Sequence, residues 1–227
     1  MKKVLITGGN KGIGLELVKK YLNNDYEVFT TYCHDNMFNR IDNVKYYELD
    51  LAKKESIDIL INEISNIDIL INNAGICIDN DIHSKSYEEF KEVIDVNLTG
   101  TLYLTSEITK EKLTKGSIVF ISSDNALTEN YSESIDYDAS KAGLIKVCED
   151  FSKYLAPNIR VNVIAPGWVN TGMNKGIDEC YKKQVVDKLL LNRFAEKREI
   201  ANVVYFLTSD DASYINGATI KVNGGIR

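Results

Sequence analysis

Tyr137 and Lys141 are the two residues of this sequence whose types and spacing most directly suggest chemistry. They stand four positions apart, so on a helix both side chains project from one face. A lysine ammonium beside a phenol favours the phenolate and lowers a pKa that is otherwise about 10. Such a pair can transfer a proton to or from a substrate oxygen. The bare spacing is common, and its alternative is an exposed tyrosine and lysine on a helix surface.

A second constellation lies near the N-terminus, where Gly8, Gly12 and Gly14 separate an apolar run from an amphipathic stretch. Gly8 permits a tight turn, Gly12 lets backbone approach a pyrophosphate, and Gly14 lets a helix pack close to a strand. The N-terminus of that helix offers free N–H groups and the positive end of its dipole to phosphates. The pattern indicates a dinucleotide site, and its alternative is a glycine-rich turn without a ligand.

Asp50 follows a further apolar run within Leu49-Asp50-Leu51. At the end of a strand its carboxylate could accept a hydrogen bond from an adenine amino group. It could equally cap the helix that follows. Both interpretations stay open at the level of sequence.

The glycine loop and Asp50 stand just after strand-like runs. We predict strands at Lys3–Thr7, Glu27–Tyr32, Val44–Glu48, Ile67–Ile71, Ser117–Ile121, Arg160–Ile164 and Thr219–Val222. Several runs are continuously apolar, which is typical of strands buried on both faces of a parallel sheet. Helical patterns lie between them. The alternation predicts one α/β domain over residues 1–227, a doubly wound Rossmann-type parallel sheet of about seven strands with helices on both faces. Ligands of such sheets bind beyond the carboxyl ends of the strands.

Composition narrows the function classes. A net charge of -6 argues against a nucleic-acid binder. No apolar run approaches the roughly 18 residues that cross a bilayer, and glycines follow the first apolar residues too early for a signal peptide. We therefore expect a cytoplasmic protein without a membrane segment. The four cysteines and two histidines lack metal-ligand spacing, so we expect reduced thiols and no metal site.

Taken together, the motifs resemble the short-chain dehydrogenase/reductase family over essentially the full chain. In the family's order, the sequence contains the glycine loop, Asn72-Asn73-Ala74-Gly75, Asn97, the pair Ser122-Ser123, Tyr137 with Lys141, and Pro166-Gly167 with Thr171. The resemblance implies an oxidoreductase that transfers hydride between a nicotinamide and a carbonyl or secondary alcohol. The full-length pattern is most similar to the 3-oxoacyl-(acyl-carrier-protein) reductases.

The same resemblance implies the site residues. Its catalytic residues are Asn97, Ser123, Tyr137 and Lys141. Tyr137 is the proton donor, Lys141 also holds the ribose, and Ser123 donates to the substrate oxygen, with Ser122 as the competing choice. Asn97 resembles the residue whose backbone kink holds a water near the lysine; its alternative is a polar position on a packed helix. The implied cofactor contacts are Gly8, Asn10, Lys11, Gly12, Ile13, Gly14, Tyr32, Asp50, Leu51, Asn73, Ala74, Gly75, Tyr137, Lys141, Pro166, Gly167, Val169 and Thr171.

The substrate is less defined than the chemistry. Residues 172–191 are expected to form a small helical lid over a small-molecule or acyl-thioester carbonyl. Carrier-protein reductases grip their acidic carrier with arginines, whereas this chain has Lys112 and Lys115 in the first region and no cation in the second, Leu155–Asn158. A small ketone, a steroid or a sugar is therefore the alternative substrate. A non-catalytic nucleotide sensor is disfavoured, because it would be expected to lack Tyr137 or Lys141.

NADP(H) is favoured over NAD(H), which stays possible. NAD-preferring relatives end the second strand with a carboxylate, and here Tyr32 stands near that position. Lys11 occupies the place where NADP-preferring relatives carry a basic residue. No arginine follows the second strand, so the additional phosphate of NADP(H) is expected to be bound by Lys11 with neutral partners such as Tyr32. The helices expected at Tyr137–Tyr154 and Glu196–Leu207 correspond to the family's subunit interface, which implies a homotetramer.

Overall fold

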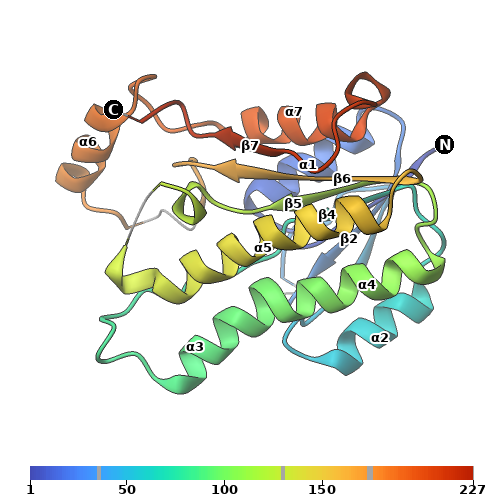
Figure 1. Ribbon diagram of the computed structural model, residues 1–227, viewed down its shortest axis with the longest axis horizontal. Coiled ribbons are helices and arrows are strands. Elements are labelled where there is room, and N and C mark those ends of the chain that lie inside the picture. The colour runs from blue at the N-terminus through green and yellow to red at the C-terminus, as the bar shows by residue number, and fades with distance from the viewer. Residues whose placement is uncertain (35–36, 129–130, 173–175, 227) are drawn as a thin grey trace.

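The continuously apolar runs form the strands of one parallel sheet. The computed structural model describes residues 1–34, 37–128, 131–172 and 176–226. Within these residues seven parallel strands follow the order β3-β2-β1-β4-β5-β6-β7 (Figure 1). Their bounds are β1 (Lys3–Ile6), β2 (Glu27–Tyr32), β3 (Val44–Glu48), β4 (Ile69–Asn72), β5 (Gly116–Ile121), β6 (Ile159–Pro166) and β7 (Thr219–Val222). The predicted doubly wound α/β sheet is confirmed, and β2, β3 and β7 have the predicted bounds.

Helices cover both faces of the sheet. They are α1 (Gly12–Leu22), α2 (Lys54–Glu63), α3 (Tyr87–Ile94), α4 (Thr101–Glu111), α5 (Ile135–Tyr154), α6 (Glu179–Lys188) and α7 (Lys197–Thr208). Figure 1 shows α1 and α7 on one face and α2, α4 and α5 on the other. Among the described residues, no helix combines the length and apolar character that crossing a bilayer requires.

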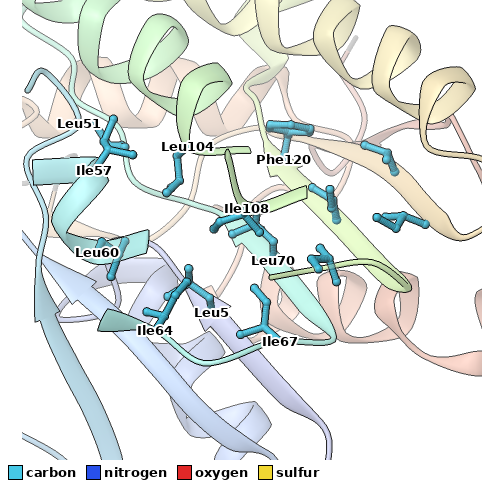
Figure 2. Packing of buried hydrophobic residues seen from close by; sticks show 14 of the residues in the cluster. Leu5, Leu51, Ile57, Leu60, Ile64, Ile67, Leu70, Leu104, Ile108 and Phe120 are labelled. Carbon is cyan, nitrogen blue, oxygen red and sulfur yellow. The ribbon is translucent and has the colours of Figure 1, made fainter. Parts of the chain in front are cut away.

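The alternation of side chains along each strand divides the core in two. Val4 and Ile6 of β1 pack with α1 and α7. Leu5, between them, faces the other side and joins a cluster to which α2 contributes Leu60 and α4 contributes Leu104 (Figure 2). Each such side chain stabilises the fold by about 1.5–3 kcal/mol when fully buried. The two clusters hold the helices in place and so fix the strand ends that carry the site.

The order of the strands reverses at β1, which lies between β2 and β4. The chain moves outward from β1 to β3 at one edge, and then continues from β4 to β7 toward the other. A reversal of this kind opens a crevice at the carboxyl ends of the two central strands. The glycine loop after β1 and the Asn-Ala-Gly segment after β4 meet at this point.

The predicted lid at 172–191 contains a shorter helix than expected. Its helix α6 begins after Asp178, whose carboxylate accepts hydrogen bonds from the backbone N–H groups of Cys180 and Tyr181 at 2.9 and 3.0 Å. This N-cap fixes the start of the helix. Residues 173–175 of the predicted lid lie outside the described residues.

Candidate active site

Thr7 and Asn73 join the ends of β1 and β4. The hydroxyl oxygen of Thr7 accepts hydrogen bonds from the backbone N–H groups of Asn73 and Ala74, each at 3.0 Å. Asn73 Nδ2 donates in turn to the carbonyl oxygens of Thr7 and Gly8 at 2.9 and 3.2 Å. Asn73 and Ala74, both predicted cofactor contacts, therefore fix the position of the glycine loop.

The glycine loop fits a dinucleotide pyrophosphate. A Cβ added to Gly12 would meet no atom within 4 Å, so the loop is open there. A Cβ added to Gly14 would lie 2.1 Å from the carbonyl oxygen of Gly8, so only glycine lets α1 start this close to β1. Lys11, just before α1, makes no side-chain cap. The first N–H groups of the helix are thus left to face a phosphate.

Asp50 lies beyond β3 with its carboxylate held by neighbours. Oδ1 accepts from the backbone N–H of Ala52 at 3.0 Å, and Oδ2 pairs with Nζ of Lys53 at 3.0 Å. Burial raises the pKa of Asp50, but the hydrogen bonds from Lys53 and Ala52, together with the charges of Lys53 and His34, lower that pKa by more. The N-cap of α2 is Lys53, so the helix-capping alternative for Asp50 is wrong. The adenine contact stays a prediction.

The fold brings Cys33 and His34 to Asp50, although their spacing in the sequence suggests no metal site. The possible ligand atoms of the three residues lie within 4.8 Å of one another, and His34 Nε2 is 3.3 Å from Asp50 Oδ2. Zinc uses these ligand types. Cys33 and His34 are exposed, however, and Asp50 is already paired with Lys53. We therefore assign no metal to this group.

The end of β2 carries a cation that the sequence analysis did not anticipate. Arg40 lies beside Tyr32, with its guanidinium carbon 5.6 Å from the tyrosine ring centre. The same carbon lies 5.8 Å from the ring centre of Phe38 and 5.4 Å from that of Tyr46. Aromatic faces hold a guanidinium without neutralising it. The expectation that no arginine follows the second strand is therefore wrong.

The structure separates the two serine candidates at the end of β5. The Ser122 hydroxyl is buried and donates to the carbonyl oxygen of Lys141 at 2.7 Å. The Ser123 side chain hydrogen-bonds with the side chain of Tyr137. Ser122 therefore anchors α5, and Ser123 is the serine that reaches the phenol.

Lys141 lies close to Tyr137 in a buried position. Its Nζ donates to the carbonyl oxygen of Ile121 at 3.0 Å and lies 5.5 Å from the ring centre of Tyr137. Burial lowers the pKa of Lys141 to about 8. Burial also raises the pKa of Tyr137, against a smaller opposite effect of the hydrogen bond with Ser123. The expected lowering of the tyrosine pKa is not found, because desolvation of the phenolate dominates.

Asn97 lies in a π-helical segment, Asp95–Gly100, between α3 and α4. Segments of this type are rare and often mark functional sites. Asn97 Oδ1 accepts from the N–H of Ile76 at 2.8 Å, and Nδ2 donates to the carbonyl oxygen of Ile76 at 2.8 Å and to Ser140 Oγ at 3.1 Å. The Ser140 hydroxyl donates to the carbonyl oxygen of Tyr137 at 2.7 Å. The Asn97 amide therefore connects the loop after β4 to the helix that carries Tyr137.

Gly75 shows how closely these groups approach one another. A Cβ at this position would lie 3.0 Å from Lys141 Nζ and 3.1 Å from Asn97 Oδ1. The polar groups of Asn97 and Lys141 therefore meet beside the backbone that follows β4. With Ser123 hydrogen-bonded to Tyr137, the structure brings all four predicted catalytic residues to one place.

The turn after β6 is held at the same edge of the sheet. Gly167 lies against Asn223, since an added Cβ would be 2.8 Å from Asn223 Cβ. Val169 pairs with Ala195 and is buried, and Thr171 donates its backbone N–H to the carbonyl oxygen of Val169 at 2.8 Å. The remaining predicted cofactor contacts are Asn10, Ile13, Leu51 and Pro166. The Leu51 side chain belongs to the core, so only its backbone can face a ligand.

Two features beside Tyr137 were missed from the sequence. Cys77, two residues after Gly75, is close enough that its ionised thiolate would raise the pKa values of Tyr137 and Lys141. The second is the buried ion pair of Lys85 with Asp136, in which Nζ and Oδ1 are 2.6 Å apart. The position of Asp136 directly before Tyr137 was a usable signal, whereas nothing in the sequence singled out Lys85.

Comparison with known proteins gives consistent matches. A family model described as enoyl-(acyl carrier protein) reductase matches residues 8–227. The 3-oxoacyl-(acyl-carrier-protein) reductase of Aquifex aeolicus is 37% identical over 241 residues, which cover 99% of this chain and 97% of the relative. The corresponding reductase of Mycobacterium bovis is 30% identical and is matched over 99% of this chain and 92% of its own.

Solved structures match equally well over the whole chain. A short-chain dehydrogenase family protein of Francisella tularensis is 32% identical with a TM-score of 0.89, covering 99% of this chain and 98% of the other. A 4-hydroxyisoleucine dehydrogenase complexed with NADH is 30% identical with a TM-score of 0.91, covering 99% and 98%. The aldohexose dehydrogenase of Thermoplasma acidophilum is 27% identical with a TM-score of 0.89, covering 99% and 93%.

Proposed function

Because the chain belongs to the short-chain dehydrogenase/reductase family, we propose that it reduces the ketone of a 3-oxoacyl thioester with NADPH as the hydride donor. It is an oxidoreductase that transfers hydride between a nicotinamide and a carbonyl or secondary alcohol. The observation that carries the proposal is the hydrogen bond between the side chains of Ser123 and Tyr137. It brings two hydroxyl groups to one point, where both could donate to a ketone oxygen.

Each site residue has a role that follows from its contacts. NADPH supplies the hydride when it is bound. Tyr137 holds the proton for the substrate oxygen, and its raised pKa keeps that proton in place at neutral pH. Ser123 donates to the same oxygen and stabilises its developing charge. Lys141 places its ammonium beside the phenol and favours the phenolate that proton transfer leaves behind.

Asn97 supports this arrangement from the other side. Its amide is bonded to both backbone groups of Ile76 and to Ser140, and Ser140 is bonded to the backbone of Tyr137. Displacement of Asn97 would therefore shift the loop after β4 and the start of α5 together. A misplacement of about 1 Å at a reacting centre can lower a rate by about a hundredfold.

The choice of a 3-oxoacyl thioester is supported by the relatives, which are described as 3-oxoacyl-(acyl-carrier-protein) reductases and align over 99% of this chain. Structural neighbours include dehydrogenases of 4-hydroxyisoleucine and of aldohexoses, so small alcohols are the second candidate class. The test is a comparison of kcat/KM for NADPH-dependent reduction of 3-oxoacyl thioesters, carried on acyl carrier protein or on coenzyme A, with small ketones, steroids and sugars. The highest efficiency on a thioester supports the proposal. A higher efficiency on any other class overturns it.

The cofactor preference is part of the same proposal. Lys11 is exposed at the start of α1, Arg40 lies over Tyr32, and the end of β2 has no carboxylate at Tyr32 to repel a phosphate. Two cations near the adenosine ribose favour the additional phosphate of NADP(H). NAD(H) is the alternative, as one structural neighbour contains NADH.

We further propose a homotetramer in the cytoplasm. Ala139 and Ala142 are exposed on α5, and Phe206 on α7 is 42% exposed although apolar. These two helices would form the subunit contact, as the family resemblance implies. The four cysteines are free thiols, as in a reducing compartment. A monomer at micromolar concentration in light scattering would overturn the assembly.

A further inference from the structure

A pocket of about 140 Å³ lies between the lid and the turn after β6. Trp168 forms its centre: the ring stacks on Phe194 at 5.4 Å between centres and meets the edges of Tyr131 and Tyr181 at 6.1 and 6.2 Å. Three aromatic side chains, from Tyr131, Trp168 and Tyr181, line the space itself. None of them takes part in the chemistry assigned above.

The lid helix supplies one complete wall. Tyr181, Val185 and Lys188 of α6 line the pocket and recur at intervals of four and three residues, which places them on one helix face. Val185 and Leu189 also belong to a small apolar cluster with Phe194, separate from the two core clusters on the faces of the sheet. This wall is therefore packed in place. Lys188 is exposed and is the only charged residue that lines the pocket within the described chain.

The other walls come from segments that flank the reacting groups. Tyr131 lies in the loop between Ser123 and Tyr137, and its backbone N–H donates to Asp138 Oδ2 at 3.5 Å. Trp168 stands between Gly167 and Val169, in the turn that the family resemblance places over the nicotinamide. A substrate whose ketone reaches Tyr137 would therefore extend its remaining atoms toward this pocket.

We propose that the pocket receives the apolar end of the substrate's acyl group and limits the part of that group beyond the ketone to about six carbons. The volume sets the limit, since an apolar cavity of about 150 Å³ holds one benzene molecule. The lining sets the class, because aromatic rings and aliphatic side chains favour an apolar group over a sugar or a charged end. The inference rests on the proposed reduction of a 3-oxoacyl thioester and specifies which thioesters the enzyme prefers.

The test measures kcat/KM with NADPH for three N-acetylcysteamine thioesters that differ only in acyl length: 3-oxobutyryl, 3-oxohexanoyl and 3-oxodecanoyl. We expect efficiency to rise from the first to the second, because a buried methylene contributes about tenfold or more to discrimination. Efficiency should then fall at least about tenfold for the third, because its seven carbons beyond the ketone overfill the space. An equal or higher efficiency on the decanoyl compound overturns the inference.

Two variants test whether this pocket is the cause. Val185→Phe fills the space and should lower efficiency on the hexanoyl compound while sparing the butyryl one. Tyr181→Ala enlarges it, lies on a side chain that is 39% exposed, and should raise efficiency on the decanoyl compound. Tyr214→Ala, at a fully exposed position outside the pocket, is the control and should leave the profile unchanged.

The outcomes separate the inference from the proposed function. If both pocket variants change all three compounds by the same factor, another surface selects the chain length and the inference is overturned, while the reductase function stands. If the wild-type enzyme reduces none of the three compounds but reduces a small ketone or a sugar with NADPH, the thioester proposal itself is overturned.

Discussion

Lys85 Nζ and Asp136 Oδ1 lie 2.6 Å apart, and the two side chains are only 1% and 2% exposed. Lys85 also donates to the carbonyl oxygen of Ile78 at 2.6 Å, so it ties the loop after β4 to the residue before Tyr137. Oδ2 of Asp136 has no hydrogen-bond partner among the described residues. A buried pair of this kind contributes little net stability by its presence, but much is lost when one partner is removed.

Lys85→Met should therefore lower the free energy of unfolding by about 3–5 kcal/mol, because Asp136 is left charged and buried without its partner. Adding Asp136→Leu should restore most of that stability, since an apolar pair carries no charge to desolvate. We expect kcat of the double variant to stay at least about tenfold low, because the directional bonds beside Tyr137 are gone. Denaturant unfolding and steady-state kinetics measure the two effects. Recovery of kcat together with stability would show that the pair is only structural.

Tyr137→Phe removes the proton donor and little else. Turnover should fall by about 10²–10⁴-fold, the range of general acid catalysis, while cofactor affinity stays largely unchanged. Ser123→Ala should also lower kcat, whereas Ser122→Ala should act mainly on stability, because its hydroxyl is bonded to the backbone of Lys141. Isothermal titration with NADP⁺ and thermal unfolding separate these effects. A Tyr137→Phe enzyme with most of its activity would show that the proton comes from elsewhere.

The pH dependence of reduction should follow Lys141. Burial lowers the pKa of its ammonium to about 8, so the charged form is present below that pH and is lost above it. Tyr137 stays protonated over the same range, because burial raises its pKa. We expect kcat/KM for NADPH, which reports groups of the free enzyme, to be level below about pH 7 and to fall as the pH rises through about 8.

Lys141→Arg is the matched variant for this profile, because a guanidinium keeps its charge throughout the range. The decline near pH 8 should disappear in any activity that this variant retains. A wild-type profile that stays level to about pH 10, or the same decline in the arginine variant, would assign the pH dependence to another group.

Gly75→Ala should damage the site without unfolding the protein. Its Cβ would lie 3.0 Å from Lys141 Nζ and 3.1 Å from Asn97 Oδ1, so one or both must move. We expect kcat to fall by about tenfold to a hundredfold. Gly172→Ala is the control, because a Cβ there meets no atom within 4 Å. If the two variants have equal kcat, Lys141 can shift at no cost to the reaction.

Much of the fold could be predicted because its signals are local. Val28 and Phe29 within the run Glu27–Tyr32 are apolar and point to opposite faces of a strand, and the structure gives β2 the same bounds. The glycine loop was predictable for the same reason, since Gly8 and Gly14 meet within a few residues of one another. Motif order also placed Tyr137 and Lys141 correctly on one helix.

What escaped prediction depends on contacts between distant residues. Arg40 lies over Tyr32 only in the folded chain, and no periodicity in the sequence encodes that contact. Lys85 contacts Asp136, which is 51 positions away in the sequence. The pKa of Tyr137 was expected to fall because a cation lies nearby, but its direction is set by burial, which sequence spacing does not report.

Arg40 is expected to contribute to the choice of cofactor. Its guanidinium is held over the rings of Tyr32, Phe38 and Tyr46, and among the described residues no carboxylate pairs with it. A bond from such a cation to a phosphate contributes about 1.5–3 kcal/mol, so Arg40→Ala should lower kcat/KM for NADPH by about tenfold to a hundredfold. Efficiency with NADH should stay the same, because it lacks that phosphate.

Lys11→Ala should act in the same direction, and the two substitutions together should bring the efficiencies with NADPH and NADH close to each other. Arg198→Ala, which removes an exposed cation on α7, is the control for net charge. Added salt should weaken NADPH binding in the wild type more than in the double variant, since exposed charges are screened. A wild-type preference for NADH would overturn the assignment of both cations. If Arg40→Ala leaves the efficiency with NADPH unchanged, Lys11 is the only one of the two cations that contacts the phosphate. The stacking of Arg40 on Tyr32 would then serve only to pack the end of β2.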